Sequence, residues 1–568
     1  MTSVGLLEVG EGNTRALEAI HAALEDTTAT ATVVGHDDAD RMDVTVAVCP
    51  VSAAYDELVS ASRGSDAPFV VVELGGVGGI AVEGVNASVF GATPRSACPD
   101  CLRRRVEASE PETDDGEFDA PTARFAGALA GHELASIVEG EPSQILGGLL
   151  EVPHAARRVL PVPFCSCAGS GGGGEGFDPA HEERTLEESI SLAEVAFDER
   201  VGPISAVGEV ESFPVPYYLA TLAGTPFSDA DAPEHAAGVG LDWDPAFMKA
   251  LGEALERYSA AVYRTSSFET EPDAPIEPSR FVQPDETQEA IEYWHEAVHL
   301  DGGDVVQLPA ELVVFPPPER RIRPAITTGL GLGNGGVDAL LSGLYEVVER
   351  DAAMLAWYST FEPLGLAVDD EGFETLAARA GSEGLEATAL LLTQDVDVPV
   401  VAACVRRDDD WPRFAIGSSA DLDPRAAARG ALEEAIQNWL ELRRMGPDAA
   451  AEQAGAIGEY ADLPERVRGF VEPETTIPVE SVGPPDVPAG AAELDLLVER
   501  VTDAGLDAYA ARLTPRDVEA IGFEAVRVVV PEAQPLFSGD PYFGSRARVV
   551  PGELGFEPRL ERAYHPFP

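Results

Sequence analysis

The sequence predicts an α/β domain at the N-terminus, followed by a second domain that mixes helices and strands. Strand-like and helix-like stretches alternate over residues 1 to about 90. A glycine-rich run then extends from Gly169 to Gly176 and is typical of a linker. Beyond this run, one glutamate-rich helical pattern occurs three times. We therefore expect a first domain over 1–170, a linker over 169–181 and a second domain over 182–568.

The first domain begins with short apolar runs that are typical of buried parallel strands, namely Leu6–Val9, Val44–Val48 and Phe69–Val72. A helix is expected from about Thr14 to Leu24. This order is found in dinucleotide-binding folds, but Arg15 stands where the third glycine of their fingerprint belongs. We therefore expect no nucleotide site there. The Gly75–Gly79 run is interpreted as a turn rather than a phosphate loop.

Four of the six cysteines form two close pairs, Cys98/Cys101 and Cys165/Cys167. Paired thiols that bracket a folded segment favour a closed, tetrahedral and therefore structural Zn²⁺ site. A redox role for the C-x-x-C pair is the alternative. Cys49 and Cys404 lie in apolar strand-like runs and are expected to be small core residues.

The repeated helical pattern reads Glu253-Ala-Leu-Glu256-Arg257, then Glu346-Val-Val-Glu349-Arg350, and more loosely Glu434-Ala-Ile-Gln437. Positions i, i+3 and i+4 share one helix face, so each of the first two copies presents two carboxylates and a guanidinium together. Helices of this kind, if they converge, would surround a hard cation such as Mg²⁺ and with it a nucleotide phosphate. Ordinary surface ion pairs remain the alternative, because 100 of the 568 residues are acidic.

The formal net charge of −62 indicates a surface adapted to high salt, as in halophilic proteins, and argues against general nucleic-acid binding. Lys249 is the only lysine and lies four residues before Glu253, so it is expected either to approach a phosphate or to pair with Glu253 on the helix surface. No apolar run spans a membrane and no secretory signal is found, so a cytoplasmic location is expected.

Three segments and the end of the chain resemble the YcaO family, whose members use ATP to activate peptide backbone amides. The resemblance covers about residues 182–568 and rests on Gly238–Gly240 with Ala246–Arg257, Gly329–Asp351, Gly417–Gln437, and the tail Tyr564–Pro568. Pro94–Arg105 and His154–Cys167 are similar, more weakly, to the ubiquitin-activating-enzyme-like partner domain with a tetrathiolate zinc that is often fused to azoline-forming members. The chain departs from the family at Val239, in place of a lysine, at Lys249, in place of a serine, and in its C-x-C knuckle.

The resemblance implies an α/β zinc-bearing domain followed by an α+β ATP-binding domain, and the cyclodehydration of Cys, Ser or Thr in a precursor peptide to thiazoline or oxazoline. The cofactors would be ATP, Mg²⁺ and Zn²⁺. The implied Mg²⁺ ligands and catalytic groups are Glu253, Glu256, Glu346, Glu349 and Glu434, with His565 of the tail as a further catalytic candidate. The implied nucleotide contacts are Gly238, Gly240, Lys249, Arg257, Asn334, Arg350 and Gln437. The implied zinc ligands are Cys98, Cys101, Cys165 and Cys167.

The same resemblance leaves other functions open. One is peptide thioamidation or an accessory role in ribosomal-protein methylthiolation, and another is a non-catalytic scaffold that docks peptides. A flavin dehydrogenase or a sulfur-donating protein is the partner expected besides the precursor peptide, and the chain itself is expected to form a homodimer.

Overall fold

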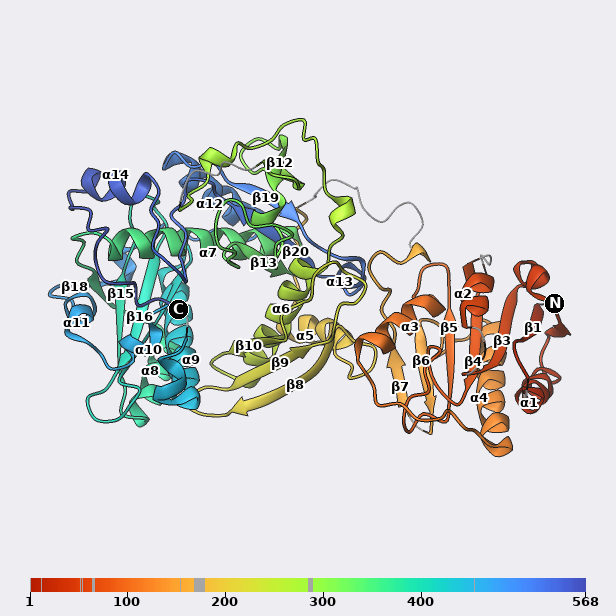
Figure 1. Cartoon of the computed structure of the whole chain (residues 1–568). Helices are drawn as coiled ribbons and strands as arrows, with labels where there is room; N and C mark the ends of the chain where they lie inside the picture. Colours follow the sequence, from red (N-terminus) through yellow and green to blue (C-terminus); the bar gives the residue numbers. More distant parts are fainter. Residues whose placement is uncertain are drawn as a thin grey trace.

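The structure is a computed structural model that describes residues 2–568 apart from 12, 52, 54, 64–66, 154, 168–178, 285–289 and 454. Figure 1 shows the N-terminal sheet in red to orange and the later sheets in yellow to blue, with the small sheet β8–β10 between them. Residues 169–178 of the expected linker, and His154, lie outside the described residues. The division into 1–170 and 182–568 therefore stays a prediction.

The N-terminal part is a seven-stranded sheet in the order β2-β1-β3-β4-β5-β6-β7. Strands β1 to β4 are parallel, and β5, β6 and β7 extend the sheet from β4, each antiparallel to the strand before it. The strands are β1 (Ser3–Glu8), β2 (Thr30–Val33), β3 (Val44–Pro50), β4 (Phe69–Leu74), β5 (Ala87–Ala92), β6 (Gly148–Val152) and β7 (Ala155–Arg158). The parallel half and its fully buried strands β3 and β4 confirm the expected α/β pattern.

Four helices accompany this sheet: α1 (Thr14–Leu24), α2 (Tyr55–Arg63), α3 (Pro99–Ala108) and α4 (Ala120–Glu139). The predicted bounds of the first helix are confirmed. The glycines after β4 form a turn, in which Gly79 donates its N–H to the buried Glu73 carboxylate, as the turn interpretation expects. Cys49 and Cys404 are buried in strands, as predicted.

The described residues of the rest of the chain form three sheets, which are antiparallel except where β14 pairs with β18. A three-stranded sheet holds β8 (Ile204–Glu211), β9 (Tyr217–Leu222) and β10 (His235–Val239). A five-stranded sheet has the order β12-β11-β19-β20-β13, formed by β11 (Trp294–His299), β12 (Val305–Pro309), β13 (Leu330–Gly333), β19 (Tyr509–Arg512) and β20 (Glu524–Val529). The other has the order β17-β16-β15-β14-β18, formed by β14 (Leu364–Ala367), β15 (Glu386–Leu391), β16 (Val400–Arg406), β17 (Phe414–Ala420) and β18 (Thr476–Pro478).

In each of these three sheets, one edge strand is followed in sequence by a long helix. These helices are α6 (Trp243–Ala261) after β10, α7 (Gly336–Trp357) after β13, and α9 (Pro424–Ala450) after β17. Helix α9 has a kink at Gly446, which adopts a left-handed φ of 79° before Pro447. The shorter helices are α5 (Leu186–Ala193), α8 (Glu371–Ser382), α10 (Ile457–Tyr460), α11 (Glu465–Val471), α12 (Ala491–Asp503), α13 (Arg516–Ala520) and α14 (Arg546–Glu553). Within the described ranges, no helix is both long and apolar enough to cross a membrane.

One apolar cluster joins the N-terminal sheet to the later domain, with Leu102 and Val106 of α3 and Leu255 of α6 among its buried members. A buried charged group lies in the same region. Arg105 of α3 pairs with Asp517 of α13, and Tyr258 of α6 donates its hydroxyl to the same carboxylate. Arg105 is 2% exposed and Asp517 is 0% exposed. Helix α3 is therefore tied to α6, the helix that carries Glu253 and Glu256.

Candidate functional site

The three glutamate-bearing helices belong to three copies of one strand–helix unit. In each copy, a strand glycine lies directly against the backbone of the helix that follows. A Cβ atom would lie 2.2 Å from Ala250 N at Gly238, 2.2 Å from Ala339 O at Gly331 and 2.5 Å from Ala435 N at Gly417. Only glycine permits this approach, because such contacts are shorter than any side chain tolerates. Gly238 and Gly240 of the predicted G-x-G segment therefore also serve strand–helix packing.

This close approach brings the first glutamate of each repeated segment to a backbone N–H group in the preceding strand or directly before it. Glu253 accepts a hydrogen bond from Ala237 N at 3.1 Å. Glu346 accepts one from Gly329 N at 2.9 Å, and Glu434 accepts one from Ser418 N at 2.5 Å. The repeated sequence pattern thus corresponds to a repeated contact, which fixes one carboxylate on each helix.

The second glutamate of the first two units is more deeply placed. Burial raises the pKa of Glu256 to about 7, with the Glu346 and Glu253 carboxylates adding to the shift. Burial likewise raises the pKa of Glu349 to about 7, and the neighbouring Glu434 carboxylate acts in the same direction. Glu349 of α7 accepts a hydrogen bond at 2.6 Å from the hydroxyl of Ser418 in β17, so this bond connects the two elements.

Two arginines separate the carboxylates. Arg257 Nη2 lies 3.3 Å from Glu253 Oε1. Arg350 lies 3.6 Å from Glu349 Oε1 through Nε and 3.6 Å from Glu434 Oε1 through Nη2, so it bridges α7 and α9. Among the described residues, the only set of three or more metal-ligating groups within 4.8 Å of one another is the cysteine set, so the five carboxylates form no closed cage. A cation here would complete its shell with phosphate oxygens and water.

A cavity of about 670 Å³ lies among these helices. Its lining includes seven residues predicted from the sequence: Gly238, Lys249, Glu253, Glu256, Asn334, Glu434 and Gln437. The predicted residues Gly240, Arg257, Glu346, Glu349, Arg350 and His565 are not part of this lining. Glu346, Glu349 and Arg350 instead form a second layer, connected to the cavity through Glu434.

The Lys249 ammonium pairs with Glu433 of α9. The predicted surface pair between Lys249 and Glu253 is wrong. The Glu253 carboxylate instead contacts Arg257 and the Ala237 N–H. The Lys249 stem reaches across the cavity instead, and joins α6 to α9. Glu433 also accepts a hydrogen bond from Leu241 N at 3.1 Å.

Sequence reasoning missed several residues that line the cavity: Arg184, Ser189, Asp338 and Glu433. Ser189 of α5 donates its hydroxyl to Asn334 Oδ1 at 2.9 Å, and Arg184 donates to the Asn334 carbonyl at 3.2 Å. No local pattern marks Arg184 or Ser189, since both lie far from the repeated units in sequence. Glu433 directly precedes Glu434, and this pair of adjacent glutamates was a weak sequence signal for its place near the site.

His565 is 2% exposed and lies among the aromatic residues of the C-terminal tail. Its ring nitrogens contact the carbonyl oxygens of Phe537 at 2.9 Å and Phe567 at 3.1 Å, and burial lowers its pKa to about 4. The tail itself reaches the charged second layer, because Arg350 Nη1 donates to a Pro568 oxygen at 3.2 Å. His565 is thus placed to hold the tail against the core.

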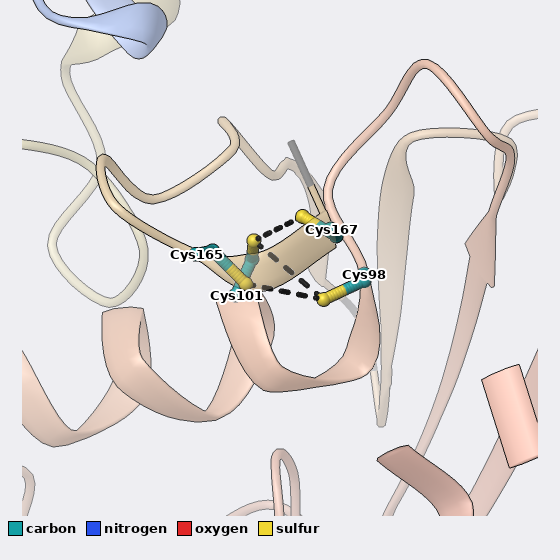
Figure 2. A group of neighbouring side chains, drawn as sticks. All are labelled: Cys98, Cys101, Cys165 and Cys167. Atoms are coloured by element: carbon teal, nitrogen blue, oxygen red, sulfur yellow. Dashed lines mark hydrogen bonds between the residues drawn. The ribbon is translucent and has the colours of Figure 1, made fainter. Parts of the chain in front are cut away.

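The four paired cysteines meet at the N-terminus of α3, as Figure 2 shows. Their sulfur atoms lie 3.8 Å apart for Cys98 and Cys101, 3.6 Å for Cys98 and Cys165, and 3.5 Å for Cys101 and Cys167. Zn–S bonds of about 2.3 Å in a tetrahedron would place sulfurs about 3.8 Å apart, so the set has the dimensions of a tetrathiolate site. All four are free thiols, and Arg516 Nη1 donates to Cys167 Sγ at 3.3 Å.

Comparison with known proteins identifies the family of the chain. Residues 237–534 match the family described as YcaO cyclodehydratase, ATP- and Mg²⁺-binding, and this match covers more than half of the chain. The chain belongs to the YcaO family. An uncharacterized protein from Methanothermobacter thermautotrophicus is 30% identical over 363 residues, which is 60% of this chain and 90% of that protein.

Two solved structures share the fold over the whole chain. One is a heterocyclase in complex with substrate and cofactor, with a TM-score of 0.74, 20% identity and coverage of 100% of this chain and 85% of that one. The other is the heterocyclase TruD, with a TM-score of 0.67, 18% identity and coverage of 100% and 84%. The arrangement of the N-terminal sheet and the later domain is therefore an arrangement found in heterocyclases.

Proposed function

We propose that the chain binds ATP with Mg²⁺ in the 670 Å³ cavity and uses it to activate a backbone amide of a peptide. The observation that supports this most directly is the threefold strand–helix unit, which brings Glu253, Glu256 and Glu434 to one cavity with arginines behind them. Carboxylates that share one cavity repel one another, as the raised pKa of Glu256 indicates, and a cation would relieve this repulsion. The ATP- and Mg²⁺-binding description of the matched family supports the same ligands.

In the proposed reaction, a Cys, Ser or Thr side chain of the peptide attacks the preceding carbonyl carbon and loses its proton. The carbonyl oxygen then takes the γ-phosphoryl group of ATP, and ADP leaves. Loss of the amide proton and departure of phosphate with that oxygen produce the thiazoline or oxazoline. Mg²⁺ neutralises charge on the phosphates in such transfers, and the protein's part is to position and neutralise.

The roles of the site residues are proposed accordingly. Glu253, Glu256 and Glu434 hold Mg²⁺ from the cavity wall, while Glu346 and Glu349 support them from the second layer. Lys249 leaves Glu433 to contact a phosphate, which supplies the positive charge that Val239 does not. Asn334 and Gln437 contact the nucleotide, and Arg257 and Arg350 set the charge of the carboxylates. His565 holds the tail in place and takes no part in the chemistry.

The cysteine set is proposed to hold one structural Zn²⁺. Its dimensions fit this ion, and its four thiol ligands leave no open position for a reaction. The peptide substrate, a flavin dehydrogenase or sulfur-donating partner, and a homodimer remain proposals that follow from the family.

The test is a reaction of the purified protein with ATP, Mg²⁺ and cysteine-containing peptides, analysed by mass spectrometry. Azoline formation removes the mass of one water per ring, whereas thioamide formation in the presence of sulfide exchanges an oxygen for a sulfur. We expect the water loss, and expect Glu434→Gln to abolish it while the exposed control Glu371→Gln does not. A peptide gaining sulfur would favour thioamidation, and no ATP turnover with any peptide would favour the scaffold.

A further inference from the structure

A second, much smaller cavity of about 20 Å³ lies behind the charged second layer. It is formed by α7, β20 and the segment before β13, and Figure 1 shows α7, β13 and β20 side by side. Three arginines line it, Arg323, Arg350 and Arg527, together with Thr328 and Gln534. No aspartate or glutamate lines it, in a chain with 100 acidic and 38 basic residues.

The arginines have unused hydrogen-bond donors at this point. The Nε atoms of Arg323 and Arg527 are buried without a hydrogen-bond partner in the described part of the chain. Arg350 Nε also makes no hydrogen bond, but it forms an ion pair with Glu349 Oε1 at 3.6 Å. Arg527 is 3% exposed, and its two Nη atoms donate to the carbonyls of Thr327 and Ile326 at 2.8 and 2.9 Å. The Glu346 and Glu256 carboxylates also attract the Arg527 charge, but they do not line the cavity.

The electrostatics of the cavity are unfavourable as it stands. Burial lowers the pKa of Arg527 to about 9, and the charge of Arg323 adds to this shift. Burial lowers the pKa of Arg323 as well. The attraction of Glu346 and Glu256 does not cancel the burial of Arg527, and that of Glu311 does not cancel the burial of Arg323, so a negative charge inside the cavity would stabilise both guanidinium groups.

We propose that this arginine cavity binds one small inorganic anion, held by Arg323, Arg350 and Arg527. A space of about 20 Å³ accepts a group of roughly the size of one water molecule, so the anion is monatomic or is an oxoanion that inserts one oxygen. Two sources share this chemistry: chloride from a saline medium, and phosphate released from ATP, the latter resting on the proposed function. The anion would hold Arg350 between Glu349 and Glu434.

The experiment measures the melting temperature at constant ionic strength while chloride, or in a second arm inorganic phosphate, replaces gluconate. Gluconate is too large for the cavity. We expect a rise on the order of 2 °C for the wild type and for the exposed control Arg320→Met, and no rise for Arg323→Met. In gluconate alone, Arg323→Met should melt no lower than the wild type, because it removes a partly buried charge that repels Arg527.

A crystal soaked in bromide gives the position directly. We expect an anomalous peak between Arg323 and Arg527. A response to chloride identifies a monatomic anion, and a response to phosphate alone identifies the oxoanion. An equal rise in Arg323→Met, or no rise with either anion together with no bromide peak, would overturn the proposal, and this result is separate from any loss of peptide activity.

Discussion

Replacing Arg105 by methionine should strongly destabilise the protein. The Arg105 and Asp517 side chains are 1% and 0% exposed, so the change leaves the Asp517 carboxylate buried with only the Tyr258 hydroxyl and its own local contacts. Removing one partner of a buried ion pair costs about 3–5 kcal/mol. An exposed pair such as Arg41 and Asp38, 71% and 53% exposed, is worth less than about 1 kcal/mol and provides the control Arg41→Met.

The assay is urea unfolding followed by both tryptophan fluorescence and far-ultraviolet circular dichroism, since coincident transitions are needed for a free energy. A double mutant, Arg105→Met with Asp517→Leu, should recover a large part of the loss, because it removes the unpaired charge. The reasoning would be refuted if Arg105→Met lowered the free energy of unfolding no more than Arg41→Met does. It would also be refuted if the double mutant lost more free energy of unfolding than the two single mutants lose in total.

Three further predictions follow from particular groups. Elemental analysis should find about one zinc per chain, and Cys101→Ser should remove it; a well-folded, metal-free protein would contradict the zinc proposal. The affinity for Mg²⁺-ATP should fall as the pH drops from 8 to 6, because Glu256, which would hold the cation, and Glu349, which would support it from the second layer, both have a pKa of about 7 and gain protons in this range; a flat profile would argue against their role. Glu73→Gln should stabilise the protein by a few kcal/mol at pH 9 and by little at pH 5, measured by urea unfolding. Burial raises the pKa of Glu73 to about 8, so the wild type loses stability as the pH rises from about 4.5 through 8, and a variant with the same pH dependence would show this wrong.

Much of the fold was readable from local pattern. The helix Thr14–Leu24, the buried strands of the first sheet and the helical placement of Glu253, Glu346 and Glu434 follow from apolar periodicity and spacing. The meeting of the four cysteines also followed, because paired thiols in one domain have few other uses.

The rest depends on contacts between distant segments. The four-residue spacing along α6 predicted that Lys249 could pair with Glu253. The lysine pairs with Glu433 instead, because α9 lies across the cavity. Arg323 and Arg527 carried no sequence signal for such a cavity, since they lie about 200 residues apart in sequence and only the fold brings them to Arg350. Of the two glycines in the G-x-G segment, Gly238 lines the cavity and Gly240 does not, and the tight packing of both on α6 could not be predicted from local sequence.

The central claim is that the glutamates of the large cavity hold Mg²⁺ for ATP, and calorimetric titration of ATP into the purified protein tests it most directly. We predict that ATP binds with Mg²⁺ and at least ten times more weakly without it, and that Glu434→Gln and Lys249→Ala each weaken Mg²⁺-ATP binding while Glu371→Gln does not. An affinity that is the same with and without Mg²⁺, and that Glu434→Gln leaves unchanged, would contradict the account.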